Sequence, residues 1–389
     1  MDFDSYYSND YAYSPVILKN ASVWKNLLWR NHSNSCHLIQ STIPDKIDNS
    51  SFQLLFTILY LIVWLAAIFG NLCVIYVVSL KQVTLSSVRS VFICSLAVSD
   101  ILMCLTSLPI TAVSLFTRDW VFPRLFCKLS GVFQGGSVFI SSFTLTAIAV
   151  DRYFFICYPV VEVISFSNAV AIVIFIWILG YCFAMPVGVF SEAEDYSPLC
   201  GLFCEETWPD ADSGGVSRIR KVYGLFVLLI QFGLPMIISC VCYYLIGQVI
   251  TEQIEKRKQQ EVILPKNQQK FNNRKARSNK MMAAMVGGLV LAWLPMNLIN
   301  LYRDFSSSEK GSEWFLLIFA ACHVVAMTSA VWNPIIYSWF NPLFRDTVKT
   351  AFKKKYAQYR RRPTETPVDA NRSNPSPHLQ PNVLLTVSL

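Results

Sequence analysis

Long stretches without a charged side chain dominate the pattern of this chain. The clearest runs between Lys128 and Asp151, where twenty-two consecutive residues carry no charge. A helix rises about 1.5 Å per residue, so such a run is long enough to cross the hydrocarbon core of a bilayer. The pattern therefore predicts a transmembrane helix, closed at one end by Cys127 and at the other by Asp151-Arg152-Tyr153.

Six further runs have a similar length and character, so the sequence predicts seven membrane spans. They cover residues 50–80, 90–117, 163–191, 222–251, 281–302 and 314–344. The predicted fold is an all-α membrane protein with a seven-helix transmembrane bundle over residues 50–340. We expect an outer tail over residues 1–49, a short amphipathic cytoplasmic helix over 341–358 and a disordered cytoplasmic tail over 359–389.

The composition and the distribution of charge agree with a membrane protein. The chain is 53% hydrophobic and only 15% charged, with a mean hydropathy of +0.41, which is too apolar for a soluble globular domain. Residues 252–280, between the fifth and sixth runs, hold nine Lys or Arg against three Glu. Basic loops stay in the cytoplasm, so we expect the N-terminus outside and the chain in the plasma membrane. Topology and lipid attraction explain the net charge of +8, without a nucleic-acid partner.

The predicted outer side carries features of the secretory route. Three Asn-x-Ser sequons there predict glycosylation, at Asn20, Asn31 and Asn49. Four of the twelve cysteines are also outside, at Cys36, Cys127, Cys200 and Cys204. Disulfides form in that environment, but four cysteines allow about three complete pairings and their spacing does not choose among them.

Polar residues and prolines interrupt the apolar runs at a few positions. Asp100 is the only acidic residue within the seven runs, and a carboxylate in lipid must find partners or take a proton, so it is a functional candidate. The alternative is a neutral, hydrogen-bonded Asp100 that only ties the first, second and seventh helices together.

The prolines inside predicted spans are Pro109, Pro186, Pro235, Pro295 and Pro334. Membrane bundles tolerate proline where neighbours satisfy the freed carbonyls.

Taken in order, the motifs of the chain resemble those of the rhodopsin-type G-protein-coupled receptors, over about residues 52–356. They are Gly70-Asn71, Leu96 to Asp100, Cys127, Asp151-Arg152-Tyr153 with Pro159, Trp177, Pro235 with Tyr243, Trp293-Leu294-Pro295, and Asn333-Pro334-x-x-Tyr337. No single motif is decisive, but the ordered set is very specific. The resemblance implies a receptor that acts on heterotrimeric G proteins, expected to be of the Gi/o class, with arrestin, receptor kinases and membrane lipids as further partners.

The outer half is similar to that of the neuropeptide Y and invertebrate neuropeptide F and FMRFamide-related receptors. The matching residue types are Thr111, Gln134, Gln231, Asn300, Asp304 and His323. The segment from Cys204 to Pro209 is similar to the group's Cys-x-Glu-x-Trp-Pro, which favours a Cys127–Cys204 disulfide. Cys36 and Cys200 then either pair or stay free. The resemblance implies an amidated peptide ligand that ends in Arg-Phe-amide or Arg-Tyr-amide.

Physical chemistry favours the same ligand class. The segment from Glu192 to Asp212 holds seven acidic residues, including Glu205 and Glu206, and no basic ones, so it attracts a cation. Asp304 is placed to pair with a guanidinium in bidentate fashion. The neutral donors and acceptors are Gln134, Gln231, Asn300 and His323. These side chains suit an amide, although each one singly is also explained by a hydrogen bond between helices.

The resemblance also implies the residues that transmit a signal. It places a possible allosteric Na⁺, and no other cofactor, at Asp100, Ser141 and Asn333, and oxygen ligands suit that hard cation. The implied switch residues are Asp151, Arg152, Tyr153, Tyr243, Trp293, Pro295, Asn333, Pro334 and Tyr337. Two positions depart from the family, with Leu289 where most relatives have Phe and Ala292 where many have Cys, so basal activity is expected to differ.

Other classes of protein fit less well. A retinal photoreceptor needs a lysine in the seventh span, and residues 314–344 contain none. A transporter is expected to show internal repeats or paired intramembrane charges, which one buried Asp100 does not provide. An enzyme is not expected, because there is no His-Glu-x-x-His and the histidines are scattered. Among receptors, the alternative is one for tachykinin-like or luqin-like amidated peptides.

Overall fold

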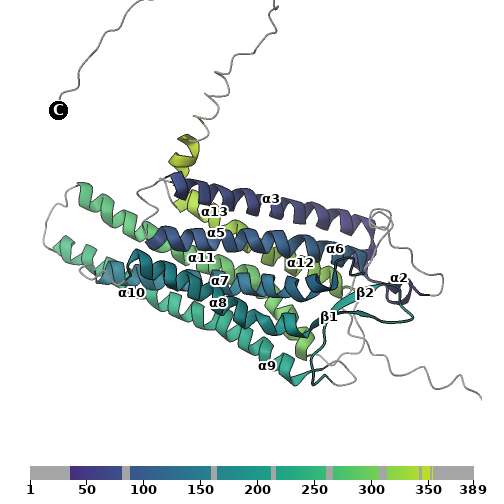
Figure 1. Cartoon of the computed structure of the whole chain (residues 1–389). Helices are drawn as coiled ribbons and strands as arrows, with labels where there is room; N and C mark the ends of the chain where they lie inside the picture. Colours follow the sequence, from purple (N-terminus) through teal and green to yellow (C-terminus); the bar gives the residue numbers. More distant parts are fainter. Residues whose placement is uncertain are drawn as a thin grey trace, which may run out of the picture. The chain divides into compact units, whose positions relative to one another are not determined.

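Helical segments of membrane-spanning length make up most of the described part of the chain. The computed structural model describes residues 36–80, 88–158, 164–211, 216–259, 266–305, 313–340, 344–350 and 353. Within these ranges, seven helical segments are long and apolar enough to cross a membrane (Figure 1). The predicted all-α bundle is therefore confirmed. Asn20, Asn31, Pro159 and the tail predicted over residues 359–389 lie outside the described residues.

Several of the seven spans are built from more than one helix. In chain order they are α3 (Ser50–Leu80), α5 (Val88–Thr106) with α6 (Leu108–Thr117), α7 (Arg124–Cys157), α8 (Phe166–Phe190), α9 (Arg218–Val227) with η2 (Leu228–Gly233) and α10 (Leu234–Gln259), α11 (Lys266–Phe305), and α12 (Phe315–Met327) with α13 (Ser329–Phe340). Helices α7, α10 and α11 continue beyond the uncharged runs, because helical hydrogen bonding does not require apolar side chains outside the lipid. Residues 344–350 are also helical, which confirms a short helix after the seventh span.

Two of the prolines inside the bundle create acceptors that neighbouring helices use. Proline has no N–H, so the carbonyl four residues earlier loses its helical donor. For Pro235 that carbonyl is Gln231, which accepts from the Ser142 hydroxyl of α7. For Pro334 it is Ala330, which accepts from Asn71 Nδ2 at 2.8 Å. These bonds hold η2 against α7 and α13 against α3. They also explain why Ser142 and Asn71 are polar although they lie inside membrane-spanning helices.

Helix α7 is the centre of the bundle, and glycines bring α8 against it. In an apolar 18-residue stretch of α7, 67% of the residues are buried, against 17% in such a stretch of α8, which faces the lipid more widely. A Cβ added at Gly136 would lie 2.4 Å from Tyr181, and one added at Gly188 would lie 2.4 Å from Val132. The two helices therefore approach as closely as they do because these positions lack side chains.

A hairpin and the segment before the first span cover the end of the bundle that carries Cys127. Strands β1 (Ser191–Asp195) and β2 (Leu202–Glu206) pair in antiparallel register and lie at the same end as α2 (Ile39–Thr42) (Figure 1). A disulfide joins Cys36 to Cys200, which answers the pairing that the sequence left open.

Hydrogen bonds and an apolar contact hold the segment around η1 (Lys46–Asp48) to the bundle. The buried Arg118 donates from Nη1 to the carbonyl of Ile43 at 2.8 Å, and the Lys46 N–H donates to the carbonyl of Glu313 at 2.8 Å. Ile47 is fully buried. The described part of the predicted tail is thus folded onto the bundle. Asn49 is exposed beside it, and its glycosylation stays a prediction.

Candidate functional site

A cavity of about 280 Å³ opens between the helices at the hairpin end of the bundle. All of the predicted ligand residues except Glu205 line it. They are Thr111 on α6, Gln134 on α7, Glu206 on β2, Gln231 in η2, Asn300 and Asp304 on α11, and His323 on α12. Trp293 also lines the cavity. The structure therefore brings together residues that are up to about two hundred positions apart in the chain.

Two arginines that the sequence analysis did not consider lie at the charged part of the cavity. Arg220 Nε is 2.9 Å from Asp304 Oδ1 and 3.6 Å from Glu206 Oε2, and Arg303 Nε is 3.4 Å from the same Asp304 oxygen. The sequence predicts that Asp304 pairs with a guanidinium of the ligand, whereas in the structure Asp304 is already paired with arginines of the protein. The acidic stretch of the sequence ends at Asp212, and Arg220 follows it near the start of α9.

The two glutamates of β2 have different surroundings because successive side chains of a strand point to opposite faces. Glu206 lines the cavity, whereas Glu205 accepts from the Tyr196 hydroxyl at 3.2 Å. Burial raises the pKa of Glu205 to about 7, against the opposing effects of that hydrogen bond and of the arginines. Burial also acts to raise the pKa of Glu206, but Arg303, Arg220 and the Trp208 N–H outweigh it and the pKa is lowered.

The neutral part of the cavity is partly tied up in contacts within the protein. Gln231 Nε2 donates to the carbonyl of Gly135 at 3.1 Å, and His323 Nδ1 lies 3.0 Å from the Tyr60 hydroxyl. Among the described residues, the buried His323 Nε2 has no hydrogen-bond partner. Tyr60 was not identified from the sequence, because it lies in the first apolar run and only its contact reveals its role.

The residues assigned to signal transmission fall into separate groups deeper in the bundle. Asp100 accepts from Ser141 at 3.3 Å and from Asn333 Nδ2 at 2.9 Å, so the predicted sodium set is assembled. Arg152 donates from Nε to its neighbour Asp151 at 2.8 Å. The hydroxyl groups of Tyr243 and Tyr337 are buried and have no partner within the described part of the chain.

Trp293 links the cavity to the seventh span. It lines the cavity and donates from its indole nitrogen to Ser329 at 3.0 Å. Pro295, one of the predicted switch residues, is inside α11 two positions later, and Pro334 lies inside α13. Ser329 was missed because nothing in the sequence distinguishes it from other serines in apolar helices.

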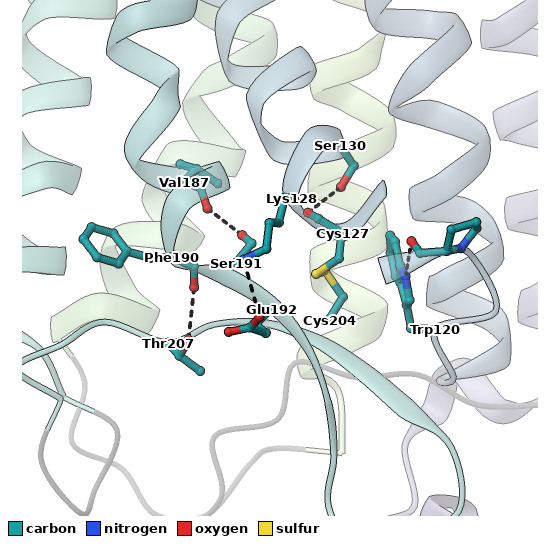
Figure 2. Close-up of a disulfide and its surroundings, with 11 residues drawn as sticks. Trp120, Cys127, Lys128, Ser130, Val187, Phe190, Ser191, Glu192, Cys204 and Thr207 are labelled. Carbon is teal, nitrogen blue, oxygen red and sulfur yellow. Dashed lines mark hydrogen bonds and ion pairs between the residues drawn. A yellow bond between two sulfur atoms is a disulfide. The ribbon is translucent and has the colours of Figure 1, made fainter. Parts of the chain in front are cut away.

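A disulfide holds the hairpin over the cavity. Cys127, near the start of α7, is joined to Cys204 on β2, as the resemblance implied (Figure 2). Lys128 forms an ion pair of 3.5 Å with Glu192 on β1 beside it (Figure 2). The position of Glu206, two residues after Cys204, is therefore set by a covalent link to the central helix.

Comparison with known proteins defines the class to which this fold and site belong. Residues 70–337 match the family of the 7 transmembrane receptor (rhodopsin family). The chain therefore belongs to that family of G-protein-coupled receptors. Members of the family are receptors and not enzymes. It is thus a multi-pass membrane protein of the plasma membrane, with a G protein as a partner.

Three relatives illustrate the closer similarity. The chain is 52% identical to Neuropeptide receptor 3 of Caenorhabditis elegans over 321 residues, which cover 82% of this chain and 84% of that protein. It is 30% identical to the Neuropeptide F receptor of Drosophila melanogaster over 311 residues, 77% of this chain and 62% of that one. It is 28% identical to the human Neuropeptide Y receptor type 2 over 322 residues, 81% of each chain.

Proposed function

We propose that the chain is a receptor for an amidated neuropeptide that ends in arginine followed by an aromatic residue. The observation that carries this proposal is that one cavity is lined both by the carboxylates of Asp304 and Glu206 and by the side-chain amides, which belong to Gln134, Gln231 and Asn300. Carboxylates pair with a guanidinium, and neutral amides pair with a peptide amide without burying an unpaired charge. The relatives named for neuropeptides support the same class of ligand.

The position of Trp293 suggests how binding is transmitted. A ligand seated in the cavity contacts Trp293, whose other partner is Ser329 on α13. A change in that contact shifts α11 against α13, and Asn333 and Arg152 lie on helices that this movement affects. The coupling is then between two distinct sites of a bundle with two arrangements, and G proteins of the Gi/o class respond to it.

Further proposals concern the environment of the bundle. We place the N-terminus outside the cell, where the hairpin meets the ligand. Na⁺ fits beside Asp100, because the Asp100 carboxylate and the Ser141 hydroxyl both offer oxygen ligands. Asn333 donates an N–H to Asp100 and thereby orients the carboxylate. Arrestin, receptor kinases and anionic lipids are proposed as partners of the cytoplasmic side.

The test is G-protein activation in cells that express the chain at their surface. The ligands are C-terminally amidated Arg-Phe and Arg-Tyr peptides, each with its free-acid form as a matched control. A response to the amides at concentrations where the acids are silent supports the proposal. Silence across the panel, with surface expression confirmed by antibody, removes this ligand class and directs the search to tachykinin-like or luqin-like peptides.

A further inference from the structure

The carboxylate that suits a ligand's arginine is already occupied by an arginine of the protein. Arg220 Nε lies 2.9 Å from Asp304 Oδ1, and the two side chains are only 17% and 7% exposed. Gly224, about one turn further along α9, makes this approach possible. A Cβ at Gly224 would stand 3.0 Å from Asp304 Oδ2. The pair is therefore a built feature of the interface between α9 and α11.

The hold of Arg220 on Asp304 is geometrically incomplete. Arg220 Nε has no aligned hydrogen bond among the described residues, although it is close enough for an ion pair. Arg303 approaches the same oxygen, Oδ1, at 3.4 Å. A bidentate guanidinium–carboxylate pair uses both oxygens and is stronger than such single contacts. A ligand arginine that engages both oxygens of Asp304 can therefore compete with Arg220.

A second carboxylate is within reach of Arg220. Glu206 Oε2 lies 3.6 Å from the same Nε, so a small movement of the side chain transfers Arg220 from Asp304 to Glu206. Leaving a partly buried charge unpaired is costly, and this transfer avoids it. The cluster thus contains two arginines and two carboxylates, namely Arg220, Arg303, Asp304 and Glu206. Within it, one guanidinium can replace another while the charges stay paired.

We propose that Arg220 is an internal competitor for the ligand's guanidinium, a residue that occupies Asp304 until a peptide arginine displaces it to Glu206. This inference rests on the proposed function. Its consequence is specificity, because a ligand without a cation at this point must bind beside the closed Arg220–Asp304 pair and gains nothing from Asp304. The receptor thus discriminates against uncharged ligands, because they leave the Arg220–Asp304 pair closed and form no ion pair of their own.

The experiment compares binding of an amidated Arg-Phe peptide with that of its citrulline analogue, which has nearly the same shape and no charge. In Arg220→Gln, affinity for the arginine peptide is expected to rise about tenfold and affinity for the citrulline peptide to change little. Lys221→Gln is the matched control. It removes the same charge from the next residue of α9, but Lys221 lies over the Phe305 ring and not on Asp304. We expect it to change both affinities by less than about twofold.

Two further variants make the result specific to the pair. Asp304→Asn added to Arg220→Gln is expected to remove the gain in affinity. If Arg220→Gln does not reach the cell surface, Arg220→Lys is used instead. Lysine keeps the charge but lacks the planar guanidinium that can bind a carboxylate through two N–H groups, so a smaller gain in affinity for the arginine peptide is expected.

Three outcomes overturn the inference. One is an unchanged or lower affinity of surface-expressed Arg220→Gln for the arginine peptide, and another is an equal gain in Lys221→Gln, which would reflect charge alone. If no amidated peptide binds or activates the natural chain, the proposed function fails and this inference fails with it. A peptide response combined with either of the first two outcomes leaves the proposed function standing.

Discussion

Glu205 and Glu206 show how much the surroundings of a single residue decide. The two carboxylates are adjacent in the sequence, and the strand places them on opposite faces. Glu206 lies with Arg220 and Arg303 and keeps a lowered pKa, whereas burial raises the pKa of Glu205 to about 7. Glu205 therefore changes its charge near neutral pH, and Glu206 does not.

This difference predicts a pH dependence of ligand binding. Glu205 does not line the cavity, but it interacts electrostatically with Arg220 and Arg303, which do. As the pH rises from about 6 to 8, Glu205 loses its proton and the potential near the cavity becomes more negative, so a cationic peptide should bind a few-fold more tightly. The measurement is the affinity of an N-acetylated peptide across this range, since the acetyl group removes the peptide's own titrating amine. Glu205→Gln should flatten the profile.

Glu194 provides the control for this experiment. It is exposed on β1, and Glu194→Gln should retain the slope of the natural chain. A slope that persists in Glu205→Gln would show that another group is responsible.

At the scale of elements, close packing of α7 and α8 depends on missing side chains. A methyl group at Gly188 would lie 2.4 Å from Val132 and 2.8 Å from the backbone carbonyl of Lys128, and a backbone atom cannot step aside. Gly188→Ala is therefore expected to destabilise the protein by about 1–3 kcal/mol through overpacking. The measurement is the thermal unfolding midpoint of the detergent-solubilised chain.

Gly247 on α10 offers the matched comparison. A Cβ there has nothing within 4 Å, so Gly247→Ala should leave stability unchanged or raise it by about 0.5–1 kcal/mol through helix propensity. Equal midpoints for the two variants would contradict a packing role for Gly188.

At the scale of the whole molecule, Asp100 joins three spans. It lies on α5 and accepts from Ser141 on α7 and Asn333 on α13. A sodium ion held there opposes any rearrangement that separates these helices. If agonist binding requires that rearrangement, sodium and agonist weaken each other's binding by the same factor.

The corresponding prediction concerns salt. Replacing choline chloride by sodium chloride at constant ionic strength should lower agonist affinity by a few-fold in the natural chain. Asp100→Asn removes the charge and should abolish the effect, with potassium chloride as the control for ionic strength. A sodium effect that survives in Asp100→Asn would place the ion elsewhere.

The sequence by itself determined the seven spans and named most of the polar residues that line the cavity. Lipid cannot hydrogen-bond a backbone, so uncharged runs of about twenty residues must become helices and their order is readable without coordinates. Gln134 is a polar residue inside an uncharged run, and Asp304 follows the end of another. The resemblance to the neuropeptide Y group, and not the apolar pattern, is what implies that both are ligand residues.

Only the tertiary structure decided which of these groups meet. The Cys36–Cys200 pair, the Tyr60–His323 hydrogen bond and the occupation of Asp304 by Arg220 join residues that are far apart in the chain. Neither composition nor periodicity records such a contact, because it depends on how several helices pack at once. The sequence thus identified a carboxylate suited to an arginine, and the packing of α9 against α11 determined that the protein's own arginine occupies it.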